Sequence, residues 1–184
     1  YHRIYPGETL RKIAFYSPSK KKLNPEIPPA VRNWYAAHRS GREDAEIFRF
    51  YRGVKKSQKQ WAIPKDSDAI FNSLDQPHIG KRVILLVAIG TEGWDCKSLT
   101  AVALPRRETT KNFVLQTTCR CLREVVSAKD ETALIALGAG NYETLDKELK
   151  ENYQLSIADL HIHDEQAINV LVRKPRLGKL RFKN

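Results

Sequence analysis

A continuous apolar run at residues 83–89, bounded by Gly80 and Gly90, constrains the fold of this chain more than any other feature. A strand with one solvent-facing side alternates apolar and polar residues, whereas a strand that is apolar throughout is typical of a parallel sheet covered on both faces. The run is also far too short to cross a bilayer. It therefore predicts the central strand of a mainly parallel sheet.

Predicted strands and helices alternate along the rest of the chain. Further strands are expected at residues 12–16, 45–51, 99–104 and 132–137. Helices are expected to begin at Pro28-Pro29, at Asp66 and at Asn141, and another is expected over residues 109–126. Alternation of this kind predicts a three-layer α/β domain with a mainly parallel sheet. We expect it to occupy residues 1–160, followed by a basic extension over residues 161–184 that forms either a β-hairpin or an extended tail.

The predicted helix over residues 109–126 has two faces. On one face, apolar residues recur at steps of four, three and four and form a stripe that we expect to be buried: Leu115, Cys119, Leu122 and Val126. Gln116, Arg120 and Arg123 are each displaced by one residue from this stripe, so their side chains share a second face beside it. Guanidinium groups make planar, bidentate contacts with phosphate, so this second face suits an anion with several oxygens. A solvated helix face with ordinary arginines is the competing interpretation, and the helix taken alone favours it.

The loop after the apolar run favours the first interpretation. Gly90 and Gly93 free the backbone to turn sharply or to approach a ligand closely. Thr91 offers a hydroxyl and a backbone N–H to a phosphate backbone. Asp95 can accept hydrogen bonds from a ribose hydroxyl or orient the arginines, and a plain helix cap is its competing role. Trp94 can stack on a base, although a tryptophan beside a central strand is more often part of the core.

Two segments together resemble signature motifs of a known family. Residues 90–96, Gly-Thr-Glu-Gly-Trp-Asp-Cys, resemble motif V of superfamily 2 helicases and translocases, and residues 116–123, Gln-Thr-Thr-Cys-Arg-Cys-Leu-Arg, resemble their motif VI. The similarity is closest to the helicase (Res) subunits of type III restriction enzymes, and residues 13–23 resemble the opening of the second motor domain. Thr117 and Cys119 depart from the arginine and glycine usual in motif VI. The resemblance implies a second RecA-like domain of an ATP-dependent DNA helicase or translocase.

The resemblance also implies roles at an ATP site. Arg120 and Arg123 match the arginines that reach ATP phosphates across the cleft between two motor domains, and one would act as an arginine finger. Gln116 would help to order them, and Gly93 and Asp95 would lie toward the nucleotide. ATP and Mg²⁺ would be bound mainly by the N-terminal RecA-like domain of the same polypeptide.

Nucleic acid is the second partner that the sequence implies. By resemblance, Ser17, Lys20 and Thr91 would lie toward the nucleic-acid backbone. Lysine and arginine together number 32 against 21 aspartates and glutamates, a net charge of +11, and such an excess favours a polyanionic partner. We expect duplex DNA, and a methylase or specificity subunit as a further protein partner. Because a signal peptide and a membrane-spanning run are absent, we expect a cytoplasmic protein with no membrane partner.

Several sequence features limit what this chain does by itself. It contains no Gly-x-x-x-x-Gly-Lys-[Ser/Thr] loop, so the chain alone is expected to be inactive toward ATP. It also contains no methionine, and we expect it to be a piece of a longer protein. No metal site is predicted, since Cys119 and Cys121 lack the second pair that a closed zinc site requires. Two alternatives stay open: a non-catalytic nucleic-acid-binding module, and an α/β enzyme acting on a small phosphorylated substrate.

Overall fold

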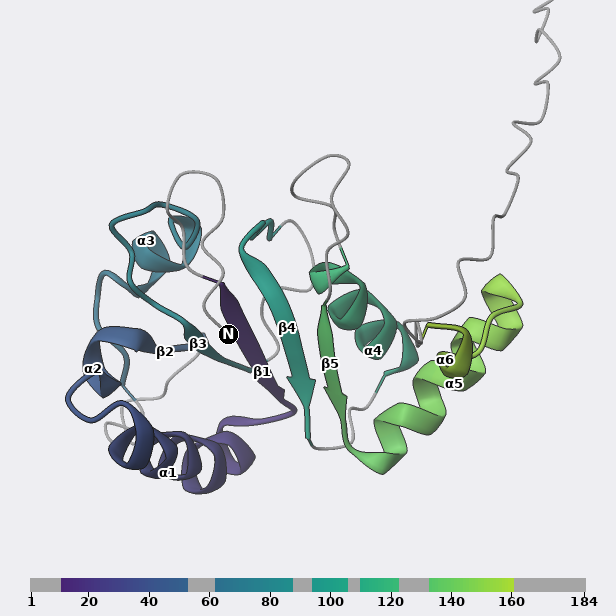
Figure 1. Cartoon of the computed structure of the whole chain (residues 1–184), viewed down its shortest axis with the longest axis horizontal. Helices are drawn as coiled ribbons and strands as arrows, with labels where there is room; N and C mark the ends of the chain where they lie inside the picture. Colours follow the sequence, from purple (N-terminus) through teal and green to yellow (C-terminus); the bar gives the residue numbers. More distant parts are fainter. Residues whose placement is uncertain (1–10, 53–61, 88–93, 106–109, 123–132, 161–184) are drawn as a thin grey trace, which may run out of the picture.

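A single parallel sheet organises the chain. The computed structural model describes residues 11–52, 62–87, 94–105, 110–122 and 133–160. The described strands, in chain order, are β1 (Lys12–Ser17), β2 (Ile47–Phe50), β3 (Val83–Val87), β4 (Leu99–Leu104) and β5 (Leu134–Leu137). They form one five-stranded sheet in the order β2-β3-β1-β4-β5, and every neighbouring pair is parallel (Figure 1). The predicted α/β class is therefore confirmed.

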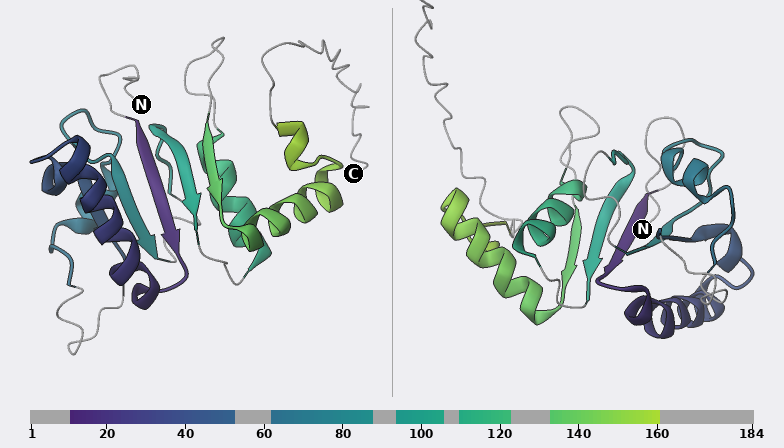
Figure 2. Two further views of the ribbon diagram at one scale, coloured as in Figure 1. Left: turned by 60° about the horizontal axis from the view of Figure 1, so that its bottom comes forward. Right: turned by 180° about the vertical axis from the view of Figure 1, so that it is seen from behind.

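Helices cover both faces of the sheet. On one face lie α1 (Lys20–His38) and, packed against it, α2 (Glu43–Glu46) (Figure 2). On the other face lie α3 (Ser67–Asn72), α4 (Lys111–Thr118), the 3₁₀ helix η2 (Cys119–Cys121) and α5 (Ala139–Tyr153), and α6 (Ile157–Leu160) follows α5. The three-layer arrangement is thus present, while the predicted extension over residues 161–184 lies outside the described residues. Among the described helices, none is long and apolar enough to cross a bilayer.

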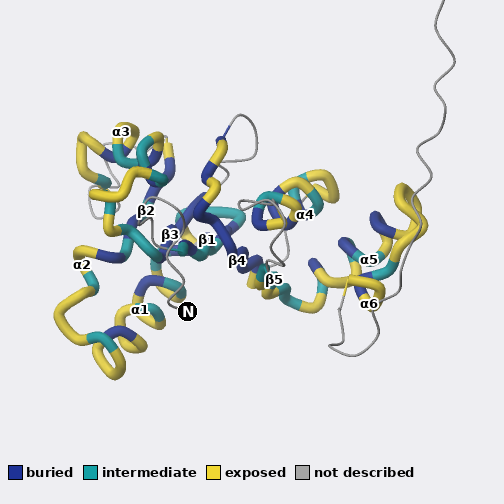
Figure 3. Tube along the Cα trace, turned by 45° about the horizontal axis from the view of Figure 1, so that its top comes forward, coloured by how far each residue is buried: buried dark blue, intermediate teal, exposed yellow. Residues whose placement is uncertain are grey.

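The side-chain pattern of the strands divides the core in two. Along β1, Ala14 and Tyr16 pack under α3, α4 and α5, whereas Ile13 and Phe15 face α1. β3 and β4 are buried along their whole length, whereas the edge strand β5 is partly exposed (Figure 3). β3 is buried at every position, as the apolar run predicts, but β1 and not β3 is central in the sheet. The order of strands is set by the crossovers between them, which a local apolar pattern does not encode.

The beginning of α1 differs from its prediction. Proline suits the first turn of a helix, so the pair at residues 28 and 29 predicts a start there. In the structure the helix begins at Lys20 and contains Pro25, Pro28 and Pro29. Each proline removes the amide that bonds the carbonyl four residues earlier, which weakens the helix locally. Leu23, in the added turn, is fully buried in the core under α1, and this burial offsets part of the cost.

The connection from β5 to α5 is fastened to the end of β4. Gly138 is the N-cap of α5, whereas Asn141, the predicted cap, lies in the first turn and is fully buried. The Asn141 side-chain amide donates to the Leu104 carbonyl at 2.9 Å, and the Gly138 amide donates to the same carbonyl at 2.9 Å. A Cβ on Gly138 would lie 2.5 Å from the carbonyl oxygen of Pro105, so the close approach of the two connections requires glycine.

Candidate functional site

The two segments singled out by the sequence meet beside η2. The Arg120 guanidinium, on η2, donates a hydrogen bond through Nη1 to the carbonyl oxygen of Trp94. Trp94 lies in the irregular segment that leads into β4, 26 residues earlier in the chain. Arg120 is half-buried in this position. The fold therefore brings a residue of the second motif-like segment against the backbone of the first.

The helix that carries Arg120 is shorter than predicted. α4 ends at Thr118 and tightens into η2, and residues 123–132 lie outside the described part of the chain. Of the predicted buried stripe, Leu115 is partly buried and packs against the core, but the prediction is wrong for Leu122, which is 51 % exposed, and for Cys119, which is exposed. The buried positions are instead Val114, Thr117, Thr118 and Cys121.

Local hydrogen bonds explain why the buried face of α4 includes two threonines. The Thr117 hydroxyl donates to the Phe113 carbonyl at 2.6 Å, and the Thr118 hydroxyl donates to the Val114 carbonyl at 2.9 Å. Each buried hydroxyl is therefore satisfied within the helix, so that burying it costs little. A prediction that counts only apolar residues misses this face.

The side chains of Gln116 and Arg120 lie in different surroundings, although the prediction placed them on one face of the helix. Gln116 is exposed on α4, whereas Arg120 turns inward to the Trp94 carbonyl. Arg123 lies outside the described residues, as do the predicted site residues Gly90, Thr91 and Gly93. Of the predicted ATP-contacting arginines, the structure thus describes Arg120.

Trp94 belongs to the core. Its side chain is 7 % exposed, and its ring stacks on Phe71 of α3 with centroids 4.8 Å apart and an interplanar angle of 21°. Phe71 stacks in turn on Phe50 of β2, with centroids 4.4 Å apart. The core interpretation of Trp94 therefore holds. Asp95 is exposed, and because a turn and then β4 follow it, its alternative role as a helix cap is wrong.

Asp75, which the sequence interpretation does not single out, anchors the segment that follows Trp94. Its Oδ2 accepts the Lys97 amide at 2.7 Å, and its Oδ1 accepts the Ser98 amide at 2.9 Å and the Ser98 hydroxyl at 2.6 Å. The Cys96 thiol also donates to Oδ1 at 3.4 Å. Burial alone would raise the pKa of Asp75, but these hydrogen bonds outweigh burial and lower it, so the carboxylate stays ionised.

Buried titratable groups surround this anchor and the arginine. Lys12, fully buried at the start of β1, has a pKa lowered by burial, which the nearby Cys96 and Asp75 partly oppose. Tyr16 is fully buried in β1, where its ring meets Phe113 edge-on at 5.6 Å. Burial raises the pKa of Tyr16, and the positive charge of Arg120 opposes this shift. The Tyr16 phenol is therefore neutral beside the guanidinium.

The cysteines fit a structural role where they are buried. Burial raises the pKa of Cys96 to about 12 and that of Cys121 to about 12, so both thiols stay protonated at neutral pH. Cys119 is exposed. Among the described residues, histidine, cysteine and carboxylate side chains form no group of three that could hold a metal ion.

Ser17 and Lys20 lie at the carboxyl end of β1. Ser17 pairs in register with Val87, the last described residue before Thr91, but its side chain is fully buried and donates to the Ser19 carbonyl at 3.3 Å. The Lys20 ammonium donates to the Arg52 carbonyl at 3.1 Å and lies 5.8 Å above the Tyr51 ring. The roles of Ser17 and Lys20 in binding nucleic acid stay predictions.

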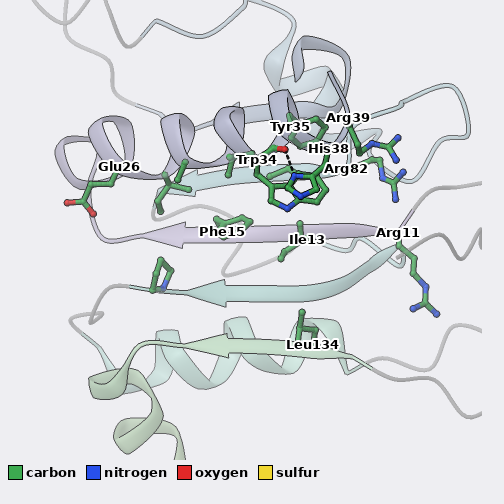
Figure 4. Close-up of a pocket in the computed structure, with 15 residues that line it drawn as sticks. Arg11, Ile13, Phe15, Glu26, Trp34, Tyr35, His38, Arg39, Arg82 and Leu134 are labelled. Atoms are coloured by element: carbon green, nitrogen blue, oxygen red, sulfur yellow. Dashed lines mark hydrogen bonds between the residues drawn. The ribbon is translucent and has the colours of Figure 1, made fainter. Parts of the chain in front are cut away.

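A groove of ≈ 820 Å³ lies elsewhere, between α1 and its face of the sheet (Figure 4). Apolar side chains such as Phe15 and Leu134 line it, and three arginines, Arg11, Arg39 and Arg82, gather at one end. Trp34, 51 % exposed and stacked on His38, forms part of its wall. None of the described residues of the predicted site lines this groove.

Comparison with known proteins supports the fold. No protein-family model and no curated protein sequence matches the chain. Domain 2 of the DEAD-box helicase Mss116p bound to an RNA duplex matches 81 % of this chain with a TM-score of 0.51 and 12 % identity. The chain spans only 50 % of that structure. The likeness shows that the fold is RecA-like, as the resemblance implied.

Two further solved structures align less closely. The match to the C-terminal domain of S. cerevisiae Dbp5 bound to Gle1 and IP6 covers 82 % of this chain and 72 % of the Dbp5 chain, with 11 % identity and a TM-score of 0.46. The match to the C-terminal part of the Fun30 ATPase domain covers 69 % of this chain and 35 % of the Fun30 chain, with 16 % identity and a TM-score of 0.38.

Proposed function

We propose that this chain is the second RecA-like motor domain of a superfamily 2 helicase or translocase. The observation that carries the proposal is the hydrogen bond from Arg120 to the Trp94 carbonyl. It joins the segment resembling motif VI to the segment resembling motif V on a RecA-like sheet. The first N-terminal motor domain, on the same polypeptide, would supply the P-loop that this chain lacks.

Arg120 would act on the phosphates of ATP. Its guanidinium always carries a positive charge, and the contact with Trp94 orients its planar donors at a fixed place on the domain. ATP supplies the phosphoryl group to be transferred, and Mg²⁺ would be held with it mainly by the N-terminal domain. The arginine and amide donors of Arg120, Arg123 and Gln116 suit phosphate oxygens, while Gly93 and Asp95 would lie toward the nucleotide.

Duplex DNA is the proposed nucleic-acid substrate. The net charge of +11 supports a polyanionic partner, which Ser17, Lys20 and Thr91 would approach. The resemblance of residues 93–96 and 120–123 to type III restriction subunits supports a restriction-type helicase subunit, with a methylase or specificity subunit as partner. We propose a cytoplasmic location for such a restriction-type subunit.

The proposal is tested with the full-length protein by measuring its nucleic-acid-stimulated ATPase activity. Arg120→Ala is expected to lower kcat by about a thousandfold or more, because arginine fingers contribute that much in comparable enzymes. Arg120→Lys keeps the charge but loses the planar donors, so we expect it to rescue activity poorly. Arg32→Ala is the matched control, since Arg32 forms an ion pair with Asp44 in which both side chains are exposed, and wild-type activity is expected.

Two outcomes separate this proposal from its alternative. Wild-type ATPase activity in Arg120→Ala contradicts the assigned role of the arginine. Salt-sensitive nucleic-acid binding without ATPase activity in the wild-type full-length protein would instead favour a non-catalytic binding module. The net charge is the observation that keeps this second function in view.

A further inference from the structure

We infer that Phe71 and Asp75 are positioning residues that hold the Trp94–Ser98 segment and, through it, the carbonyl that orients Arg120. Phe71 lies in α3, and Asp75 lies in the turn after that helix. The catalytic part of this inference rests on the proposed function, because it concerns the same arginine. The positioning itself rests on contacts among described residues.

The Asp75 carboxylate fixes one end of the segment through its backbone. Two consecutive main-chain amides, of Lys97 and Ser98, donate to its two oxygens at 2.7 and 2.9 Å. The Ser98 hydroxyl adds a third hydrogen bond at 2.6 Å. A carboxylate that binds successive amides constrains the path of the chain itself and not only its side chains. These hydrogen bonds fasten residues 96–98, which lie 21 to 23 positions after Asp75 in the sequence, to the turn after α3.

Phe71 fixes the other end of the segment through a ring. The Trp94 indole stacks on it at 4.8 Å and is 7 % exposed, so the indole has little room to move. Phe50 lies behind Phe71 at 4.4 Å and joins this stack to β2. The short stretch from Trp94 to Ser98 is therefore held at both ends by the unit formed by α3 and its following turn.

The Trp94 carbonyl lies within this held stretch and accepts the hydrogen bond from Arg120. A displacement of the carbonyl therefore moves or releases the guanidinium. Misplacing a catalytic group by about 1 Å can lower a rate about a hundredfold. Asp75 accepts hydrogen bonds from residues 96–98, and through this segment it acts on the arginine.

The test compares Asp75→Asn, Ser98→Ala and Glu46→Gln in the full-length protein. Asp75→Asn replaces a double acceptor, and we expect kcat for ATP to fall about 10- to 100-fold with KM and nucleic-acid Kd nearly unchanged. Ser98→Ala removes the hydroxyl's hydrogen bonds with Asp75 and with Cys96 Sγ without changing a charge beside Lys12, and a smaller fall of a few-fold is expected. Glu46→Gln perturbs a buried carboxylate on the opposite face and is expected to leave kcat unchanged.

Trp94 fluorescence gives a second readout that does not depend on activity. The contribution of Trp94 is obtained by subtracting the spectrum of the same variant carrying Trp94→Phe. Asp75→Asn and Ser98→Ala are expected to shift this contribution, and Glu46→Gln is not, because only the first two loosen the segment. Should Asp75→Asn prevent folding, Ser98→Ala decides the question in the same two measurements.

The outcomes distinguish this inference from the proposed function. If Arg120→Ala abolishes ATPase activity while Asp75→Asn and Ser98→Ala change neither kcat nor the Trp94 signal, the positioning role is overturned and the motor assignment stands. A fall in kcat without a shift of the Trp94 signal also overturns it, since the effect would not pass through the segment. If Arg120→Ala keeps full activity, the proposed function fails, and the Trp94 signal alone still tests whether Asp75 holds the segment.

Discussion

The two faces of the sheet are each fastened by a buried carboxylate, but the two carboxylates have different partners. On the α1 face, Glu46 is 4 % exposed and accepts the Tyr35 hydroxyl at 3.0 Å and the Arg39 guanidinium at 2.8 Å. On the other face, Asp75 accepts mainly from the Trp94–Ser98 segment, including two main-chain amides. The first carboxylate joins two helices, whereas the second holds an irregular stretch of chain.

This difference separates a scaffold from a site. A helix already satisfies its own backbone, so a buried carboxylate that meets it through side chains adds stability without setting the path of the chain. An irregular segment has no such internal pattern, and its backbone amides need outside acceptors. The face with the candidate site is therefore the one on which a side chain determines backbone position.

The largest expected effect on stability comes from removing the Glu46 carboxylate on the α1 face. Glu46→Ala removes the buried acceptor of the Tyr35 hydroxyl and the Arg39 guanidinium, so it is expected to lower the free energy of unfolding by more than the changes below. The Arg39 side chain is 27 % exposed and keeps some contact with water, which limits the loss. Chemical denaturation measures the loss, and the ATPase kcat of the folded full-length protein should not change. A loss of kcat larger than the loss of folded protein would contradict the division into scaffold and site.

An intermediate effect on stability is expected on the other face, where the main chain at the start of α5 packs closely on the segment after β4. Gly138→Ala places a methyl group 2.5 Å from the Pro105 carbonyl oxygen, and relieving this clash is expected to cost about 2 kcal/mol. Gly80→Ala is the matched control, since nothing lies within 4 Å of the added Cβ and a change within about 0.5 kcal/mol is expected. Denaturation midpoints of the two variants compare them directly. Equal midpoints would show that the connection yields without cost.

The smallest expected effect concerns pH on the scaffold face. Burial, together with the hydrogen bond to Glu46, raises the pKa of Tyr35 to about 12. Because the folded pKa exceeds the ordinary value of about 10, the stability linked to the neutral phenol is fully present below pH 10 and is lost as pH rises toward 12. Tyr35→Phe should cost about 1 kcal/mol at neutral pH and remove this alkaline loss.

Stability measured across the alkaline range checks this prediction, with phenolate absorbance reporting the titration. On the opposite face of the sheet, the stability contributed by Asp75 should depend on acidic pH instead. The pKa of Asp75 is lowered, so its contribution is present above the ordinary aspartate range and is lost as pH falls. If the loss of stability at alkaline pH persists unchanged in Tyr35→Phe, another group causes that loss.

Local patterns predicted the strands of this fold better than its helices. The strand at Leu99–Leu104 has the predicted bounds, and β3 begins at the predicted Val83, because burial on both faces leaves a continuous apolar run. The start of α1 was missed since three prolines lie inside it, and tertiary burial of Leu23 overrode the local preference. The order of the strands follows from crossovers and has no local signal.

The candidate site was predictable only in part, for a related reason. Arg120 could be found because its spacing within a motif is a local feature. Asp75 could not, since its partners lie more than twenty residues away and its own neighbourhood is an ordinary turn. The buried face of α4 was misplaced because satisfied threonine hydroxyls behave there as apolar groups.

The hydrogen bond between Arg120 and Trp94 has a consequence for the timing of events in the proposed motor. A free arginine side chain samples many rotamers, and immobilising it costs about 2 kcal/mol of entropy. Because the domain itself holds Arg120 against Trp94, that ordering occurs when the chain folds and not each time two motor domains close. In the proposed motor, each closure would then begin with an arginine already held in place, and a repeated conformational search would not slow turnover.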